Sequence, residues 1–489
     1  MPITFNGIPS NLRVPGVFIE INNDLANSAV ANKKIVVTGQ QLATGSAQAG
    51  MLVRVSSKAQ ADQLYGRGSM LASMLSIMLD NNSYTEIWAV GLDDDPAGVA
   101  ASGYIRFVGA ASHNGTIRVY IGGESVAVGV AAGTTAATLA TNVIAAINAN
   151  SELLVTAAID GVNNYQVNLT AKNKGLAGNE IVTEVLYEAA STPSAPAITI
   201  SQLAGGTTNP DIAPFLTALG DEWWNWVAFP YNDATSLTAL EAELLDRWGP
   251  MRGKPGRAFI SFRGTHSAAS TFGNGRNSHL VCCVPAGVSL QPSYLWAAAS
   301  CAVAAASLSE NPSRQLRGLA LDGILAPNTE DRWTDAERNV HLWDGLSTYT
   351  VDSAGIVRLE RVITMYQTNE SGLADNSYLD ITLMETQDAV RYEQRKHLAT
   401  VFARYSLAAD ASGISPGVQV VDPKRIKAEL GALYQDKFIP AGWCEDYTGY
   451  MASLLVEIDP NDPTRVNFRD VPNYTAPLYV IAGKQQFIV

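Results

Sequence analysis

The chain has 489 residues, of which 47% are hydrophobic and 16% charged, and its formal net charge is −13 at pH 7. The length predicts two or three domains, and the hydrophobic fraction excludes a disordered chain. The negative charge and the lack of basic tracts exclude a nucleic-acid binder, which needs clustered Lys and Arg to displace phosphate counterions. The low charged fraction fits a surface largely covered by subunit contacts.

Cysteine usage and the first residues bear on the compartment in which the chain is made. The spacing of the cysteines matches neither a disulfide framework nor a CxxC pair, which favours a reducing cytoplasm. They are Cys282, Cys283, Cys301 and Cys444. The first six residues lack the basic and apolar regions of a signal peptide, and no apolar run is long enough to cross a bilayer. The sequence predicts a chain that is neither secreted through a signal peptide nor inserted in a membrane.

The first predicted elements are a short terminal strand and an α/β layer. Residues 14–22 read as a strand behind a loose leader. Further strands are predicted over residues 34–38, 51–56 and 86–90. The helix before the last of these is predicted from apolar residues at i, i+3, i+4 and i+7, a spacing typical of a core-facing stripe. These residues are Leu71, Met74, Leu75 and Met78.

Two turn-rich breaks enclose a segment of different composition. Residues 93–96 (Asp-Asp-Asp-Pro) are interpreted as a solvated linker, because the D-x-D-x-D-G pattern of a cation loop is absent. The second break covers residues 205–210. Between them the sequence predicts a small inserted α+β domain whose first hairpin turns at Gly122-Gly123. Its other expected elements are a helix with Leu139, Val143, Ala146 and Ile147 and strands at 155–159, 166–169 and 180–187.

Strand and helix alternate again after the insert, which predicts a largely parallel layer. The aromatic run Trp223 to Phe229 is interpreted as a strand buried on both faces rather than as a ligand platform. Strands are also predicted at 258–262 and 280–284. Two helices are expected here, one with Leu237, Leu240, Leu244 and Trp248 on one side and one over residues 295–308.

A second α/β part is predicted from residue 333. Residues 348–351 and 356–359 form a predicted hairpin, and residues 361–367 read as a further strand. A long helix is expected to reach past Arg404. Its apolar residues at helical spacing are Leu398, Val401, Phe402 and Tyr405.

Both chain ends read as strands without an obvious partner. Residues 465–469 alternate, while residues 478–481 and 485–489 are apolar to the last position. An unpaired apolar strand is a sticky edge, so something must pair with it. Either each strand pairs within its own chain at the edge of a mixed sheet, or it is donated to a neighbouring subunit by β-augmentation. The residues alone favour neither interpretation.

The sequence contains no catalytic or metal-binding pattern in the context that such a pattern needs. Residues 413–417 match G-x-S-x-G, but Pro416 has no N–H to donate to an oxyanion, so a surface turn is expected. The two Gly-Lys pairs lack the spacing of a phosphate loop. The histidines show no zinc-ligand spacing and are expected to be isolated. They are His113, His266, His279, His341 and His397. No enzyme activity, cofactor or metal is therefore predicted.

Both termini resemble those of the Mu-like branch of the contractile phage tail sheath family. The marks are the Pro-Gly-Val-Phe-Ile-Glu opening at residues 15–20 and the ending Arg-Val-Asn-Phe-Arg-Asp-Val-Pro-Asn, then Ala-Gly-Lys-Gln-Gln-Phe-Ile, within residues 465–488. Residues 361–381 and the helix after them are similar to the strand, loop and helix of sheath C-terminal domains. The likeness covers residues 1–25, most of 345–489 and, more weakly, 210–330.

This resemblance implies a structural subunit that stacks in sixfold rings around a tail tube and contracts from a metastable state. It implies partners in other copies of the chain, the tube protein, and baseplate and terminator proteins, in a virion tail assembled in the host cytoplasm. The implied donated strands are Val17, Phe18, Ile19, Glu20 and Ile21 at the start and Gln485, Gln486, Phe487, Ile488 and Val489 at the end. The edge that accepts them, or the strand beside it, is expected at Leu478, Tyr479, Val480 and Ile481.

The predicted fold is α/β and α+β multidomain, with a sheath core of mixed sheets and packed helices. The predicted parts are an N-terminal arm (1–30), a core α/β domain (31–95 and 208–332), an inserted outward-facing α+β domain (96–207), a C-terminal α/β domain (333–464) and a C-terminal strand arm (465–489). Two alternatives stay open. One is the sheath of a related contractile injection system or bacteriocin. The other is a soluble α/β enzyme with a site in the loop region 264–275.

Overall fold

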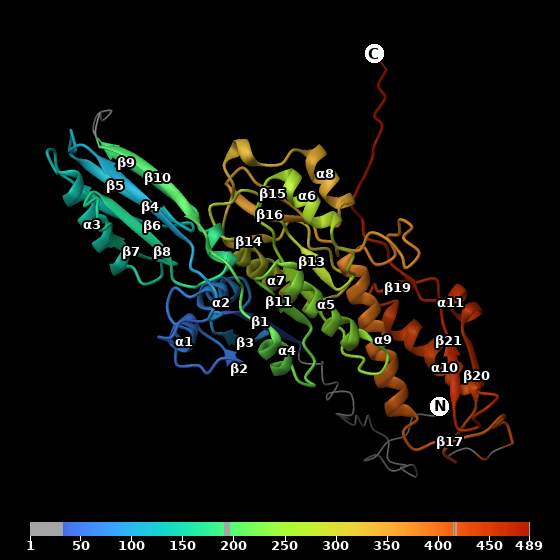
Figure 1. Cartoon of the computed structure of the whole chain (residues 1–489). Helices are drawn as coiled ribbons and strands as arrows, with labels where there is room; N and C mark the ends of the chain where they lie inside the picture. Colours follow the sequence, from blue (N-terminus) through green and yellow to red (C-terminus); the bar gives the residue numbers. More distant parts are fainter. Residues whose placement is uncertain (1–32, 190–195, 414, 416–417, 489) are drawn as a thin grey trace, which may run out of the picture. The chain divides into compact units, whose positions relative to one another are not determined.

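The computed structural model describes residues 33–189, 196–413, 415 and 418–488, and from Lys34 onward the chain forms one compact unit. Its elements are traced in Figure 1. The described part has two hydrophobic cores, a large one built by residues 35–381 and a smaller one built by residues 390–454. The predicted mixed sheet with packed helices lies in the large core, whereas the sheets of the smaller part have two strands each.

A six-stranded sheet lies at the centre of the large core, in the order β13-β12-β11-β1-β3-β2. Its strands are β1 (Lys34–Gln40), β2 (Leu52–Val55), β3 (Glu86–Leu92), β11 (Trp226–Ala228), β12 (Arg257–Ile260) and β13 (Val281–Cys283). All neighbours are parallel except β2, which runs antiparallel to β3. The predicted parallel layer is confirmed. Trp226, Val227 and Ala228 are at most 1% exposed, as expected of a strand with both faces covered.

The helices that accompany this sheet are α1 (Lys58–Tyr65), α2 (Met70–Asn81), α4 (Ala213–Ala218), α5 (Ala234–Trp248), α6 (His266–Asn274) and α7 (Ser293–Glu310). Of these, α2, α5 and α7 were predicted from the sequence, whereas α1, α4 and α6 were not. The predicted stripe of α2 is fully buried, and Ser69 caps the helix by accepting a hydrogen bond from the N–H of Ala72. Helix α7 is rich in Ala and Ser, so it packs closely against α2 and the sheet with nearly its whole surface buried.

A smaller antiparallel sheet extends the large core, in the order β14-β16-β15. It consists of β14 (Ala320–Leu325), β15 (Thr348–Val351) and β16 (Ile356–Arg361), with the short η2 (Thr329–Asp331) and helix α8 (Asp335–Trp343) in the connection. The hairpin of β15 and β16 matches the prediction. Strand β14 pairs with β16, so one sheet spans the domain boundary predicted between residues 332 and 333. The part with its own core begins later, along the helix that follows residue 380.

The insert contains two antiparallel sheets and one long helix. The sheets are β10-β4-β8-β7 and β6-β5-β9. Their strands are β4 (Ser102–Val108), β5 (Gly115–Ile121), β6 (Glu124–Val130), β7 (Val155–Ile159), β8 (Gln166–Ala171), β9 (Thr183–Ala189) and β10 (Ala197–Ala204), with α3 (Ala136–Ala149) and the short η1 (Leu176–Glu180). Gly122 and Gly123 turn the β5–β6 hairpin with φ of 59° and 93°, values that favour glycine. An isolated bridge between Val99 and Thr207 closes the stem of the insert.

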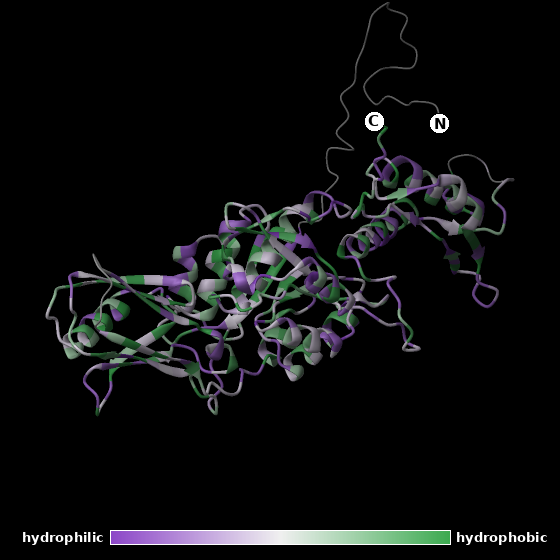
Figure 2. Cartoon of the chain, turned by 90° about the horizontal axis from the view of Figure 1, so that it is seen from above, coloured by the Kyte–Doolittle hydropathy of each residue, from purple (hydrophilic) through white to green (hydrophobic). Residues whose placement is uncertain are grey.

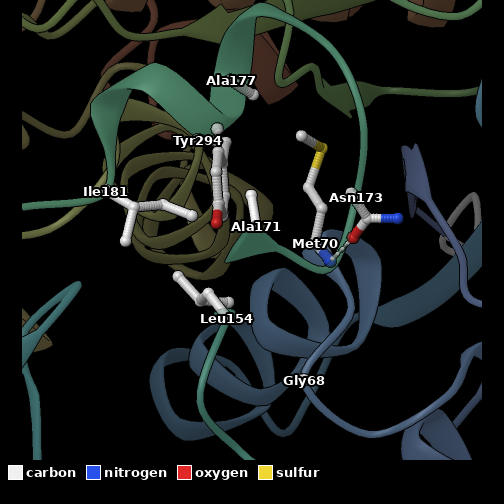
Figure 3. Close-up of a pocket in the computed structure, with 9 residues that line it drawn as sticks. Gly68, Met70, Leu154, Ala171, Asn173, Ala177, Ile181 and Tyr294 are labelled. Carbon is white, nitrogen blue, oxygen red and sulfur yellow. Dashed lines mark hydrogen bonds between the residues drawn. The ribbon is translucent and has the colours of Figure 1, made fainter. Parts of the chain in front are cut away.

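The acidic break before the insert is only partly the solvated linker that was predicted. Asp93 and Pro96 are exposed, whereas Asp94 is half-buried and takes part in a structural joint. The carboxylate of Asp94 accepts hydrogen bonds from Gln40 Nε2 (2.6 Å), Asn173 Nδ2 (3.2 Å) and the N–H of Lys174 (2.9 Å). Asn173 also accepts a hydrogen bond from the N–H of Met70 beside a small pocket shared by α2, α7 and the insert (Figure 3). The joint is therefore held by side chains from both of its sides.

The C-terminal part packs around its own core, which includes Val390, Leu430, Tyr434, Phe438 and Tyr450. The rings of Tyr434 and Tyr450 stack with centroids 3.8 Å apart. The elements are α9 (Ile381–Val401), β17 (Ser406–Leu407), β18 (Val420–Val421), α10 (Pro423–Leu433), the π-turn η3 (Tyr434–Phe438), β19 (Cys444–Glu445), α11 (Tyr447–Ser453), β20 (Leu455–Ile458), β21 (Val466–Arg469) and β22 (Asn473–Tyr474).

Two predicted elements of this region are wrong in extent. Residues 362–367 form no strand, because their backbone bonds go to separate partners: the N–H of Thr364 donates to Leu379, and that of Met365 donates to Val281. Helix α9 ends at Val401 instead of passing Arg404. The N–H of Tyr405 turns back to the carbonyl of Phe402, three residues earlier, so the helical bond pattern stops there.

Candidate subunit interface

The terminal segment, residues 475–488, contains no strand in the single chain. Leu478, Val480, Ile481, Phe487 and Ile488 are between 68% and 101% exposed. Figure 2 colours the end of this segment as hydrophobic, and Figure 1 draws it without a strand arrow. The strands predicted at 478–481 and 485–489 are therefore not formed within residues 478–488, because no sheet edge in the described part of the chain pairs with them. Val489 and the predicted strand Val17 to Ile21 lie outside the described residues.

Tyr479 differs from its neighbours because its side chain faces the folded body. Its hydroxyl donates a hydrogen bond to Asp380 Oδ1 (2.8 Å), and its ring lies 4.1 Å from the guanidinium carbon of Arg361. Burial, together with the charge of Asp380, raises the pKa of this phenol. Four residues were expected to form an accepting edge. Tyr479 is held against the folded body, whereas Leu478, Val480 and Ile481 are exposed.

A second feature is a two-stranded sheet with open edges. Strand β21 was predicted by its alternation, and it pairs antiparallel with β20 from Leu455–Arg469 to Ile458–Val466. Within the described part of the chain neither strand has a second partner. Leu455 and Phe468 are 48% and 41% exposed. A two-stranded sheet is marginal alone, and its free N–H and C=O groups suit a further strand. The sequence analysis predicted no strand at residues 455–458, where β20 lies.

The described residues offer little for catalysis. They contain no group of three or more His, Cys, Asp or Glu side chains that could hold a metal ion. All four cysteines are buried and unpaired, and burial raises the pKa of the Cys282 thiol to about 12 and that of Cys444 to about 11, which disfavours a thiolate. The G-x-S-x-G string lies partly outside the described residues. The region 264–275 suggested for an enzyme site is mostly helix α6 rather than a loop.

No helix in the portion that the structure describes is both long enough and apolar enough to cross a bilayer.

The histidines are not all isolated, since His266 and His341 stack with ring centroids 4.5 Å apart. His341 is fully buried and packs edge-on against Trp333, with centroids 4.2 Å apart. Burial, aided by the nearby His266, lowers the pKa of His341 to about 4. The side chain of His341 is therefore a neutral imidazole packed in the protein interior.

This neutral histidine predicts a loss of stability in acid. The unfolded chain binds a proton at His341 near pH 6.5, whereas the folded chain resists it down to about pH 4. The contribution of His341 to the free energy of unfolding is greatest above pH 6.5. It falls as the pH decreases toward 4, by about 2 kcal/mol between pH 6.5 and 5. Urea unfolding at both pH values measures it. His341→Phe should reduce the slope, and His113→Phe, at an exposed position, should not. Equal slopes in all three proteins would contradict the assignment.

The chain is similar to known proteins in sequence, and it aligns with solved structures. A model of the phage tail sheath protein central domain matches residues 205–365. A Mu-like prophage tail sheath protein of Haemophilus influenzae is 39% identical over 492 residues and covers 100% of both chains. The crystal structure of a sheath tail protein from Desulfitobacterium hafniense aligns with a TM-score of 0.49 at 15% identity, over 94% of this chain and 100% of that one.

The helical sheath of the anti-feeding prophage in its contracted state aligns with a TM-score of 0.48 at 13% identity, over 97% of this chain and 99% of that chain. Family membership rests on the Haemophilus relative, because its identity extends over the full length of both proteins. The chain belongs to the phage tail sheath protein family, as a structural subunit rather than an enzyme.

Proposed function

We propose that this subunit polymerises as stacked hexameric rings around a tail tube and contracts from a metastable extended state, driving the tube through the host envelope. The observation that carries the proposal is the terminal segment, whose apolar residues are exposed and unpaired on a folded body. Such a segment suits association with further copies of the chain. The full-length likeness to a Mu-like tail sheath supports the same role.

Strand exchange is the proposed linkage between subunits. Val17 to Ile21 and Gln485 to Val489 act as donated strands, bound by backbone hydrogen bonds, with alternate side chains fixing the register. The open β20–β21 sheet is a better acceptor than residues 478–481, because it already presents strand geometry and free edges. Strands exchanged in this way join the subunits into a mesh, which keeps them attached while their folded bodies move.

Contraction on this proposal needs no nucleotide. If each subunit gains a few kcal/mol from better contacts in the contracted form, neighbouring subunits linked by strands release that energy cooperatively. On this proposal the free energy that drives contraction is stored in the contacts between the assembled subunits. The chain contributes packing surfaces instead of a phosphate-binding loop.

Partners and placement follow from the same proposal. The chain contacts its own copies, the tail tube protein, and baseplate and terminator proteins, and it resides in the virion tail after assembly in the host cytoplasm. The insert at 96–207 faces outward, while the core (31–95 and 208–332) and the C-terminal part with its arms build the mesh. The side-chain joint at Asp94 supports an insert that moves with the core.

Self-assembly is the direct test. Negative-stain electron microscopy and sedimentation velocity of the recombinant chain over a range of concentrations should show hollow tubes or stacked rings. The tube protein is co-expressed in a parallel sample as a template. A chain that remains a uniform monomer at every concentration, with and without the tube protein, contradicts the proposed function.

A further inference from the structure

The last attachment of the terminal segment to the body, within the described residues, is at Tyr479. Three contacts hold this residue. The phenol donates to Asp380, the ring stacks on the guanidinium of Arg361, and the backbone carbonyl accepts a hydrogen bond from Arg317 Nη1 (3.1 Å). A hydrogen bond to a carboxylate and a cation–π contact are each stronger when partly shielded from water. Tyr479 is therefore held through both its side chain and its backbone.

The socket for Tyr479 is formed by Arg317, Arg361 and Asp380, and two of these residues also contact each other. Arg361 Nη2 pairs with Asp380 Oδ1 at 3.1 Å, and the two side chains are only 25% and 15% exposed. Asp380 is the N-cap residue of α9, yet its carboxylate caps no backbone N–H there. It serves Arg361 and Tyr479 instead, so three separate parts of the chain fix the socket.

The contacts on either side of Tyr479 differ sharply. Before it, the next backbone anchor is Thr475, whose N–H donates to Trp443 (3.1 Å) and whose hydroxyl donates to Gly442 (2.8 Å). After it, residues 480–488 are all exposed, and Val480 and Ile481 reach 79% and 85%. Tyr479 thus marks the last fixed position of the described chain.

We propose that Tyr479 stays in the socket of its own chain when the end of the segment is donated to a neighbour, so that Val480 to Lys484 form the whole tether between body and donated strand. This inference rests on the proposed strand exchange. Six Cα steps separate Tyr479 from Gln485, which limits the tether to about 20 Å. The acceptor edge must lie within that distance of the socket in both the extended and the contracted sheath.

Loss of the anchor would lengthen the tether. Thr475 becomes the last fixed residue, and ten Cα steps to Gln485 allow about 33 Å. Tyr479 therefore sets how far two linked subunits can separate. It acts as a positioning residue and does not belong to the donated strand.

Photo-crosslinking tests whether the anchor persists in assemblies. A photoreactive phenylalanine derivative replaces Tyr479, and chains labelled with heavy nitrogen are mixed with unlabelled chains before assembly. The expected crosslinks join residue 479 to peptides containing Arg317, Arg361 or Asp380, with both halves of each pair from the same isotope pool. Pairs of mixed isotope in tubes, or the absence of these crosslinks in tubes, would overturn the proposal.

A distance measurement on the free, unassembled subunit tests the anchor independently of assembly. Spin labels are placed at Arg314→Cys, near the socket in sequence, and at Lys484→Cys, while the four native cysteines are buried. Tyr479→Ala should broaden the distance distribution, and Tyr479→Phe, which keeps the ring, should broaden it less. Tyr84→Ala, at a 92% exposed tyrosine, is the matched control and should change nothing.

The two tests separate the possible failures. A wild-type distribution as broad as that of Tyr479→Ala overturns the anchor even if tubes form. Narrow distributions in a chain that never polymerises leave the anchor intact in the free subunit and overturn both the strand exchange and the tether that depends on it.

Discussion

A chain that ends at Ala482 is expected to fold normally and to form no tubes. The deletion removes residues 483–489, and all of those that the structure describes, 483–488, are exposed. The melting temperature and circular dichroism spectrum should therefore match those of the full chain. Polymer formation should be lost, because Phe487 and Ile488 supply the apolar side chains of the proposed donated strand. Electron microscopy and sedimentation of both chains at equal concentration provide the measurement.

A matched control separates the strand from the tether. Gly483→Ser with Lys484→Ser changes the residues next to the cut but keeps Gln485 to Val489, so this variant should still assemble. Tubes of wild-type appearance from the truncated chain would refute the assignment of residues 485–489 as a donated strand. Failure of the control variant to assemble would show that residues 483 and 484 are themselves needed.

Removal of one carboxylate at the contact between the two cores should cause a large loss of stability. Arg257 of β12 is fully buried, and its guanidinium pairs with Asp388 of α9, which also accepts a hydrogen bond from Trp248 Nε1 (3.2 Å). Asp388→Ala leaves a buried charge without its carboxylate partner, at a cost of about 3–5 kcal/mol. Urea unfolding of the dispersed chain, followed by tryptophan fluorescence, measures the change.

Two further variants test the physical reason. The double variant Arg257→Met with Asp388→Leu removes both charges and should regain most of the lost stability. Glu310→Ala breaks the exposed pair with Arg314, whose side chains are 71% and 62% exposed, and should cost less than about 1 kcal/mol. An Asp388→Ala chain as stable as the Glu310→Ala chain would show that the buried pair contributes nothing specific.

Periodicity predicted the elements that bury one clear face. The stripe of α2, the Gly122-Gly123 hairpin and the parallel sheet follow from local spacing, and the structure has them. Strands β4 and β10 were not predicted: Ser102 to Val108 begins with a Ser-Gly pair and carries Arg106, while β10 interrupts its apolar residues with Thr199, Ser201 and Gln202. Residues 362–367 misled the prediction, since β-prone side chains there serve scattered long-range backbone bonds.

The candidate interface was only partly accessible to sequence reasoning. The amino-acid sequence shows that the end of the chain is apolar. The structure adds that this end has no strand partner within the described residues. The role of Tyr479 depends on Arg317, Arg361 and Asp380, which lie 99 to 162 residues away along the chain. The same holds for Asp94, whose partner Asn173 is 79 residues distant. No local pattern encodes such pairs.

The closed stem of the insert has a consequence for how this family can diversify. Val99 and Thr207 lie opposite each other in a bridge, so the chain leaves the core and returns to it at adjacent points. A segment attached in this way can be replaced by a shorter or longer one without shifting β3 or β11 in the central sheet. The insert and the core can then change at different rates during evolution, and a foreign domain could be joined to the chain between these two residues.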